Sequence, residues 1–278
     1  MDYKKITETV KTQLQGYQIK YALILFMMLM ISTVLNQINA MEVILENNFI
    51  YILFVIIILF LSVVQNTVYF LFIKRVRKEK FGMSDIRYSF SKTLLHLSSS
   101  ILLAILQMGI QMIVLLIASF APMLVSPIMI IVQVFVASVS VFIAFGIYDG
   151  IRGAMVLVNC SFKLMKKHIK NIFLIALPYL IWTLLCQLGM NFLLTLIQDT
   201  VSTSTLDVIM KALSTSDVQI YGWMMLGLML IRTLGECFLL VPVYTGYANM
   251  YEADYCDIYP MSHMPLSSNV IDIDVEES

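Results

Sequence analysis

Charged residues are scarce in this sequence. Asp, Glu, Lys and Arg make up 13% of its 278 residues, whereas an ordinary soluble domain carries roughly 25%. Hydrophobic residues make up 60% of the chain, and the mean hydropathy is +0.87. They occur in runs of about twenty, the length that a helix needs to cross ~30 Å of hydrocarbon. This composition excludes a water-soluble globular protein and predicts a chain whose solvent is lipid.

Cysteines and catalytic motifs are also scarce. The four cysteines form no C-x-x-C pair, so we expect neither a disulfide framework nor a zinc site. The sequence contains no H-E-x-x-H, no G-x-S-x-G and no Walker-type phosphate loop. Its three histidines are scattered, with no metal-ligand spacing. We therefore predict that the protein is not an enzyme and needs no cofactor.

Six apolar runs are long enough to be membrane spans. They cover residues 21–35, 49–73, 94–120, 123–148, 172–197 and 220–243. The first run ends without a small-residue cleavage site, so we interpret it as a retained span rather than a signal peptide. The predicted fold class is all-α, a polytopic membrane helical bundle. The membrane domain covers residues 1–250, and residues 204–213, between the last two spans, are predicted to form a short outer helix.

The distribution of Lys and Arg predicts the orientation of the spans. Of the eighteen such residues, four precede span one, seven lie between spans two and three, and five lie between spans four and five. Only Lys211 lies in a loop on the opposite side, and Arg232 lies inside a span. Because Lys and Arg are translocated unfavourably, we expect both termini in the cytoplasm of a multi-pass cell-membrane protein.

A basic amphipathic helix is predicted before each of spans one, three and five. The apolar stripes are Tyr3, Ile6, Val10, Leu14 and Tyr17; Ile86, Phe90, Leu94 and Leu97; and Val158, Phe162, Met165 and Ile169. We expect these helices to lie in the headgroup layer and to contact anionic lipid through nearby cations. The predicted headgroup contacts are Lys74, Arg75, Arg77, Lys163, Lys166 and Lys167. The pattern describes either three copies of one unit or the ordinary basic lead-in of any outward-going span, and both interpretations stay open.

Four polar residues inside the spans form a candidate intramembrane polar site. Arg232 and Glu236 are four residues apart in span six and so share a helix face. A lone charge in lipid costs several kcal/mol, so we expect them to pair. Gln107 and Gln111 likewise share a face of span three. These residues either line a path for a polar substrate or a proton, or form a structural ion pair and ordinary interhelical hydrogen bonds.

The segment after span six is acidic. From Glu252 to Ser278 it carries seven acids and no Lys or Arg, a composition typical of a flexible tail, which we assign to residues 251–278. The tail either docks on the basic face or on a protein partner, or it stays free. At the end of span four, Asp149 is expected to pair with its neighbour Arg152 near the interface.

Three stretches of the sequence carry a family resemblance. They are the amphipathic start with its first span, GIRGAMVLVNCSFKLMKKHIKNIFLIALPYLIW (Gly150 to Trp182) and LVPVYTGYANMYEADY (Leu240 to Tyr255). Together they resemble a group of uncharacterised bacterial six-span integral membrane proteins that are similar to the membrane domain of glycerophosphodiester phosphodiesterases. The resemblance implies the same six-span fold. It implies no reaction, because the soluble phosphodiesterase domain has no counterpart in this sequence.

Two functions fit these patterns. The first is a non-enzymatic membrane protein that organises anionic lipid or a membrane partner complex. The alternative is the permease subunit of a type-two ATP-binding-cassette exporter, which the layout also resembles and which would need a separate ATPase. The third basic lead-in helix weighs against the permease, because that layout does not require it. The expected partners are membrane lipids, a protein docked on the acidic tail or an ATPase, and no nucleic acid.

Overall fold

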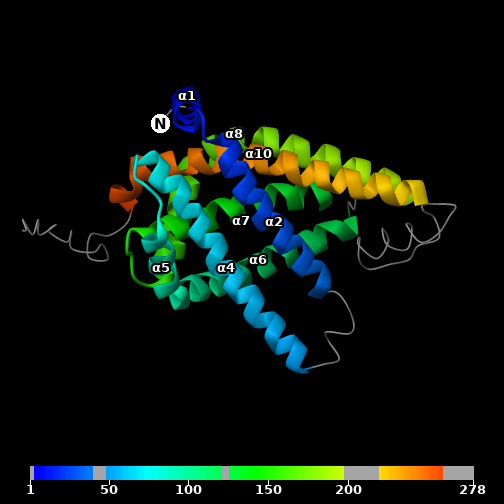
Figure 1. Ribbon diagram of the computed structural model, residues 1–278, viewed down its shortest axis with the longest axis horizontal. Coiled ribbons are helices and arrows are strands. Elements are labelled where there is room, and N and C mark those ends of the chain that lie inside the picture. Colours follow the sequence, from blue (N-terminus) through cyan, green and yellow to red (C-terminus); the bar gives the residue numbers. More distant parts are fainter. Residues whose placement is uncertain (1–2, 40–47, 121–124, 197–218, 259–278) are drawn as a thin grey trace, which may run out of the picture.

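The computed structural model describes residues 3–39, 48–120, 125–196 and 219–258, and their secondary structure is entirely helical (Figure 1). The helices are α1 (Tyr3–Leu14), α2 (Gln18–Asn39), α4 (Asn48–Val76), α5 (Met83–Ser91), α6 (Thr93–Phe120), α7 (Val125–Tyr148), α8 (Ala154–Leu196) and α10 (Gln219–Ile258). The predicted all-α class is therefore confirmed for these residues. The outer helix predicted at residues 204–213 lies outside them.

Several helices are long and apolar enough to cross a membrane. Within the described residues, four pass this test by themselves: Thr93–Val114, Ile128–Tyr148, Ala154–Leu193 and Gln219–Asp254. A fifth is reached if Tyr3–Leu14 and Gln18–Ile31, which meet at 90°, count as one broken span. Large apolar side chains such as Leu116 and Leu188 are about two-thirds exposed, at 67% and 65%. Such a surface is compatible with a multi-pass membrane protein.

Helices α8 and α10 are the two longest helices of the described residues. They run side by side along the long axis in Figure 1 and pack extensively against each other. Their 43 and 40 residues make each helix about 60 Å long at 1.5 Å per residue. This is roughly twice the thickness of the hydrocarbon core. Helices of this length extend beyond the hydrocarbon unless they are strongly tilted.

One end of the bundle gathers the basic segments, and we call it the basic end. Arg77, just after α4, contacts Asp149, just after α7, and Glu252, near the end of α10. Lys167, in the first half of α8, contacts Asp254 of α10. Segments that we assigned to one side of the membrane therefore lie together.

The main core lies toward the basic end. Its largest fully buried side chains are Phe70, Phe72, Phe142, Phe145, Tyr247 and Tyr251, from α4, α7 and α10. A separate small cluster at the other end contains Met190, Leu193 and Met225. The close packing of the larger cluster holds the polar side chains around it in defined positions.

The three predicted lead-in helices are built in three different ways. Gly16, with φ +79°, turns the chain between α1 and α2, and α1 packs its stripe of Ile6, Val10 and Leu14 against α10 and α8. That stripe therefore contacts protein, not the headgroup layer that we expected. Helix α5 buries the polar residues Asp85 and Ser89 instead of its apolar stripe.

Before span five there is no separate helix. Residues 154–196 form the single helix α8, because no Gly or Pro interrupts residues 154–177. Its buried residues in the basic half include Leu157, Ser161, Leu164 and His168. Of the predicted stripe only Val158 is buried, so most of the buried face is displaced from that stripe. Helix α10 in turn continues to Ile258, so residues 251–258 belong to the helical body and not to the predicted tail.

Candidate functional site

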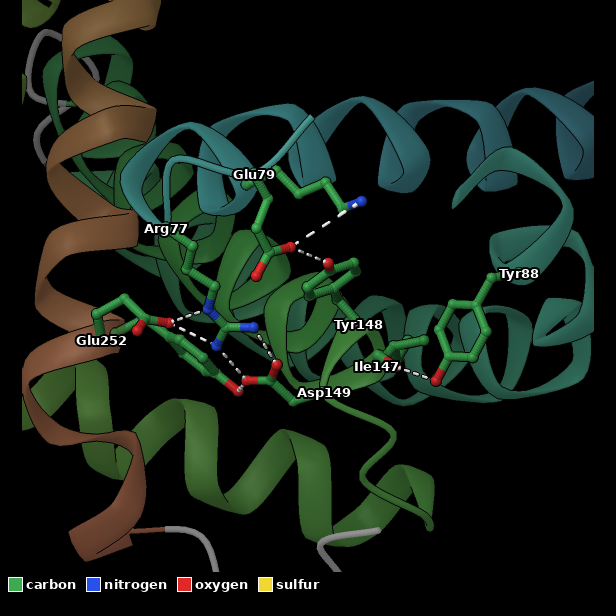
Figure 2. Close-up of polar contacts among 9 residues, drawn as sticks. Arg77, Glu79, Tyr88, Ile147, Tyr148, Asp149 and Glu252 are labelled. Atoms are coloured by element: carbon green, nitrogen blue, oxygen red, sulfur yellow. Dashed lines mark hydrogen bonds and ion pairs between the residues drawn. The ribbon is translucent and has the colours of Figure 1, made fainter. Parts of the chain in front are cut away.

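An arginine joins three helix ends at the basic end (Figure 2). The Nη1 and Nη2 atoms of Arg77 donate to the two carboxylate oxygens of Asp149 at 2.6 and 2.9 Å, and its Nε donates to Glu252 at 2.7 Å. The hydroxyl of Tyr251 donates to Asp149 at 2.8 Å. Burial by itself would lower the pKa of Arg77, but the two carboxylates outweigh it and raise that pKa above its usual value. Asp149 thus has Arg77 as its partner, where we expected Arg152.

A second group of contacts holds the loop after α4 and helix α5. Tyr148 donates its hydroxyl to Glu79 at 2.8 Å, and Tyr88 donates to the carbonyl of Ile147 at 3.1 Å (Figure 2). Lys74 is 2.7 Å from the carboxylate of Asp85. These contacts fix residues 77–90 against the end of α7. The same segment forms one wall of the cavity described next, through Lys78, Glu79, Lys80, Phe81, Ile86 and Phe90.

A pocket of about 700 Å³ opens beside this wall, between α2, α4 and α5. Its charged residues are Lys20, Arg75, Lys78, Glu79 and Lys80. Its apolar lining consists of Ile24, Val64, Val68, Leu71, Phe81, Ile86 and Phe90. The volume falls in the range of small-molecule sites, roughly 300–1,000 Å³. We call this cavity the basic-rimmed pocket.

Arg75 is held in place within the basic-rimmed pocket. Its Nε donates to the carbonyl of Gln13 at 2.7 Å, and its guanidinium lies 3.8 Å from the ring centroid of Tyr17. Among the described residues, no acceptor contacts its two terminal nitrogens. A fixed guanidinium with two such nitrogens matches the geometry of a phosphate or a carboxylate.

Lys78 lies in the left-handed region, with φ +60°. It follows the end of α4, where the amide of Glu79 donates to Lys74 at 2.8 Å and closes the last turn. Glycine is the usual residue at such a position, because a side chain there costs roughly 1–2 kcal/mol. The lysine instead adds a cation to the basic-rimmed pocket. Strained backbone of this kind is often found at functional sites.

The predicted headgroup contacts have several different environments. Arg75 lines the basic-rimmed pocket, whereas Arg77 and Lys74 contact carboxylates. Lys163 and Lys166 are exposed on α8. Lys167 contacts the carboxylate of Asp254, and the Nε2 atom of His168 is hydrogen-bonded to the same carboxylate. Sequence reasoning missed the pocket role of Lys20, Lys78 and Lys80, since their only signal was membership of a basic segment.

The four residues of the predicted intramembrane site do not form one cluster. Arg232 contacts Glu236 at 2.8 Å and donates to Gln187 of α8 at 3.3 Å. Gln107 lines a cavity between α4, α6 and α7 that neither Arg232 nor Glu236 lines, and Gln111 is exposed on α6. The expected ion pair is therefore present in α10, and the two glutamines of α6 lie apart from it.

No arrangement in the described part of the chain provides three His, Cys, Asp or Glu side chains for a metal ion. Comparison of the whole chain with protein-family models, curated proteins and solved structures finds no match. The resemblance to the membrane domain of glycerophosphodiester phosphodiesterases thus stays a prediction from the sequence.

Proposed function

We propose that this protein is a six-span, non-enzymatic protein of the cell membrane that binds an anionic lipid in the basic-rimmed pocket. In this proposal α2 and α4 add two spans to the four that pass by themselves, and the asymmetry of Lys and Arg puts both termini in the cytoplasm. The observation that carries the proposal is the pocket itself, which combines a cationic rim with an apolar lining.

The charge of the pocket favours an anionic ligand. Lys20, Arg75, Lys78 and Lys80 contribute four positive charges and Glu79 one negative charge, which leaves three positive charges. Each cation near an anionic lipid surface contributes about 1 kcal/mol of attraction. The terminal nitrogens of Arg75 are suited to a bidentate contact with the lipid phosphate.

The apolar lining favours a lipid over a free anion. Val64, Val68 and Leu71 form one face of α4 along the pocket, and Ile24 of α2 and Phe90 of α5 also line it. An acyl chain that covers these side chains gains roughly 25 cal/mol for each Å² removed from water. Inorganic phosphate would contact only the rim. A lipid should therefore bind more tightly than phosphate, because only the lipid covers the apolar lining.

The variant Lys78→Gly tests lipid binding without an expected loss of folding stability. Glycine adopts φ +60° without strain, so we expect the variant to be as stable as the wild type or slightly more stable. Loss of one rim cation should weaken the binding of phosphatidylglycerol about fivefold, the equivalent of ~1 kcal/mol. Native mass spectrometry of the purified protein with added phosphatidylglycerol measures the affinity, and thermal unfolding in the same detergent measures stability.

The matched control is Lys166→Gln, which removes an exposed cation of α8 outside the pocket. It should bind phosphatidylglycerol as the wild type does. The proposal fails if Lys78→Gly and Lys166→Gln bind equally well, or if zwitterionic phosphatidylcholine binds as tightly as phosphatidylglycerol. Equal competition by inorganic phosphate would also contradict a lipid ligand, because it would leave the apolar lining without a role.

A further inference from the structure

A second cavity brings together amide side chains from three helices. Gln65 of α4, Gln107 of α6 and Gln133 of α7 all line a cavity of about 250 Å³. Its other lining residues include Asn66, Tyr69, Ser100, Ser140 and Tyr244. Gln65 and Gln133 are exposed at the surface of the bundle, whereas Asn66 and Gln107 are half-buried, so the cavity is open. These residues lie well inside their helices, at membrane depth in the six-span arrangement. We call this cavity the polar chamber.

The amides of the polar chamber have few partners in the protein. Gln65 donates to Tyr69 on its own helix at 3.1 Å. Among the described residues, the side-chain amides of Asn66, Gln107 and Gln133 have no hydrogen-bond partner. The interhelical hydrogen bond that was one interpretation of Gln107 is therefore not formed among these residues. An unpaired amide that faces hydrocarbon costs several kcal/mol, so amides at membrane depth favour contact with water or a polar solute in the open cavity.

The charge and size of the polar chamber define the class of occupant. Among the described residues, no Lys, Arg, Asp or Glu lines it. A neighbouring cavity of about 160 Å³ shares Gln133 and Tyr244 and reaches Glu236, but Arg232 neutralises that carboxylate at 2.8 Å. The 250 Å³ of the chamber equals the liquid volume of roughly eight waters. An uncharged solute of the size of glycerol fits these limits.

Hydroxyl groups match the lining best. Each carboxamide offers both donors and an acceptor, and each hydroxyl both donates and accepts. We propose that the polar chamber is a water-accessible binding site for a small polyhydroxyl solute. This site goes beyond lipid binding, and it does not depend on the basic-rimmed pocket.

Cysteine labelling tests whether water and a polyol enter the chamber. The native cysteines are replaced by Ala, Ser140→Cys is introduced, and the protein in lipid vesicles is treated with a hydrophilic thiol reagent that requires a thiolate. The control is Ile105→Cys, which is 61% exposed on α6 and does not line the chamber. We expect rapid labelling at Ser140→Cys and slow labelling at Ile105→Cys.

Protection by a solute tests binding. Glycerol should slow the labelling of Ser140→Cys several-fold, whereas 1-propanol, which has one hydroxyl on the same carbon skeleton, should not. Gln107→Leu should remove the protection by glycerol without preventing the labelling. If the cysteine-free chain is not recovered, only Cys256 is replaced by Ala and the other three cysteines are kept, because Cys160, Cys186 and Cys237 are buried. The labelling of this background is then subtracted from that of its Ser140→Cys variant.

Three results overturn the proposal. They are no labelling of folded Ser140→Cys protein, equal protection by glycerol and 1-propanol, and protection by glycerol that survives Gln107→Leu. None of them bears on the affinity for phosphatidylglycerol, so the test is independent of the lipid-binding proposal.

Discussion

At the scale of residues, three neighbouring cations have three different roles. Arg75 presents its terminal nitrogens at the basic-rimmed pocket, Arg77 joins three helix ends, and Lys78 adds a cation to the pocket from a left-handed backbone position. The sequence pattern treats Arg75 and Arg77 as equivalent headgroup contacts. Their roles differ because successive residues at the end of a helix point in different directions around its axis.

Arg77→Gln should destabilise the protein by about 2–4 kcal/mol, because it leaves Asp149 and Glu252 half-buried without their shared cation. Tyr251→Phe removes only the hydroxyl donated to Asp149 and should cost about 1–2 kcal/mol. Thermal unfolding in detergent measures both variants. An Arg77→Gln protein that unfolds at the wild-type temperature would show that this contact contributes little.

Gly235→Ala should destabilise the packing of α10 on α8. A methyl group there would lie 2.3 Å from the indole of Trp182, whose Nε1 donates to the carbonyl of Arg232 at 3.1 Å. We expect a loss of about 1–3 kcal/mol in thermal unfolding, together with a change in tryptophan fluorescence. Gly227→Ala on the same helix is the control, because nothing lies within 4 Å of its added Cβ. Equal stability of the two variants would contradict this close contact.

At the scale of elements, the same amphipathic signal leads to different structures. Helix α1 packs on protein through its apolar stripe, α5 buries polar side chains, and the basic lead-in of span five merges with that span. The presence or absence of a glycine explains the first and third cases. Gly16 permits a sharp turn after α1, and no such residue interrupts the first half of α8.

Substitutions on the buried and the exposed face of α1 test how this helix docks on α10. The side-chain amides of Gln13 and Asn249 exchange hydrogen bonds of 3.2 and 2.8 Å, and Ile6 is fully buried. Ile6→Asp would bury an unpaired charge and should release α1, with faster hydrogen exchange over residues 3–14. Lys4→Asp on the exposed face should leave exchange unchanged. Slow exchange in Ile6→Asp would show that α1 is held by contacts other than its apolar stripe.

At the scale of the whole molecule, the basic segments lie at one end, and a labelling experiment can assign that end to a side of the membrane. The retention of Lys and Arg on the cytoplasmic side predicts that Lys166→Cys is protected from a membrane-impermeant thiol reagent in intact cells and reacts in broken cells. Lys211→Cys, on the opposite side of the predicted topology, should react in intact cells. The reverse result would invert the orientation and move the basic-rimmed pocket to the outer leaflet.

The sequence by itself determined the features that depend on neighbours along the chain. Apolar runs predict all-α structure, and the Arg232–Glu236 pair follows from a spacing of four residues on one helix. Only the tertiary structure decided which helices bring their side chains together. Gln13 and Asn249 are 236 positions apart, and Arg77 and Asp149 are 72 apart. Such contacts depend on how the helices pack, and a helical period says which residues share a face but not what that face meets.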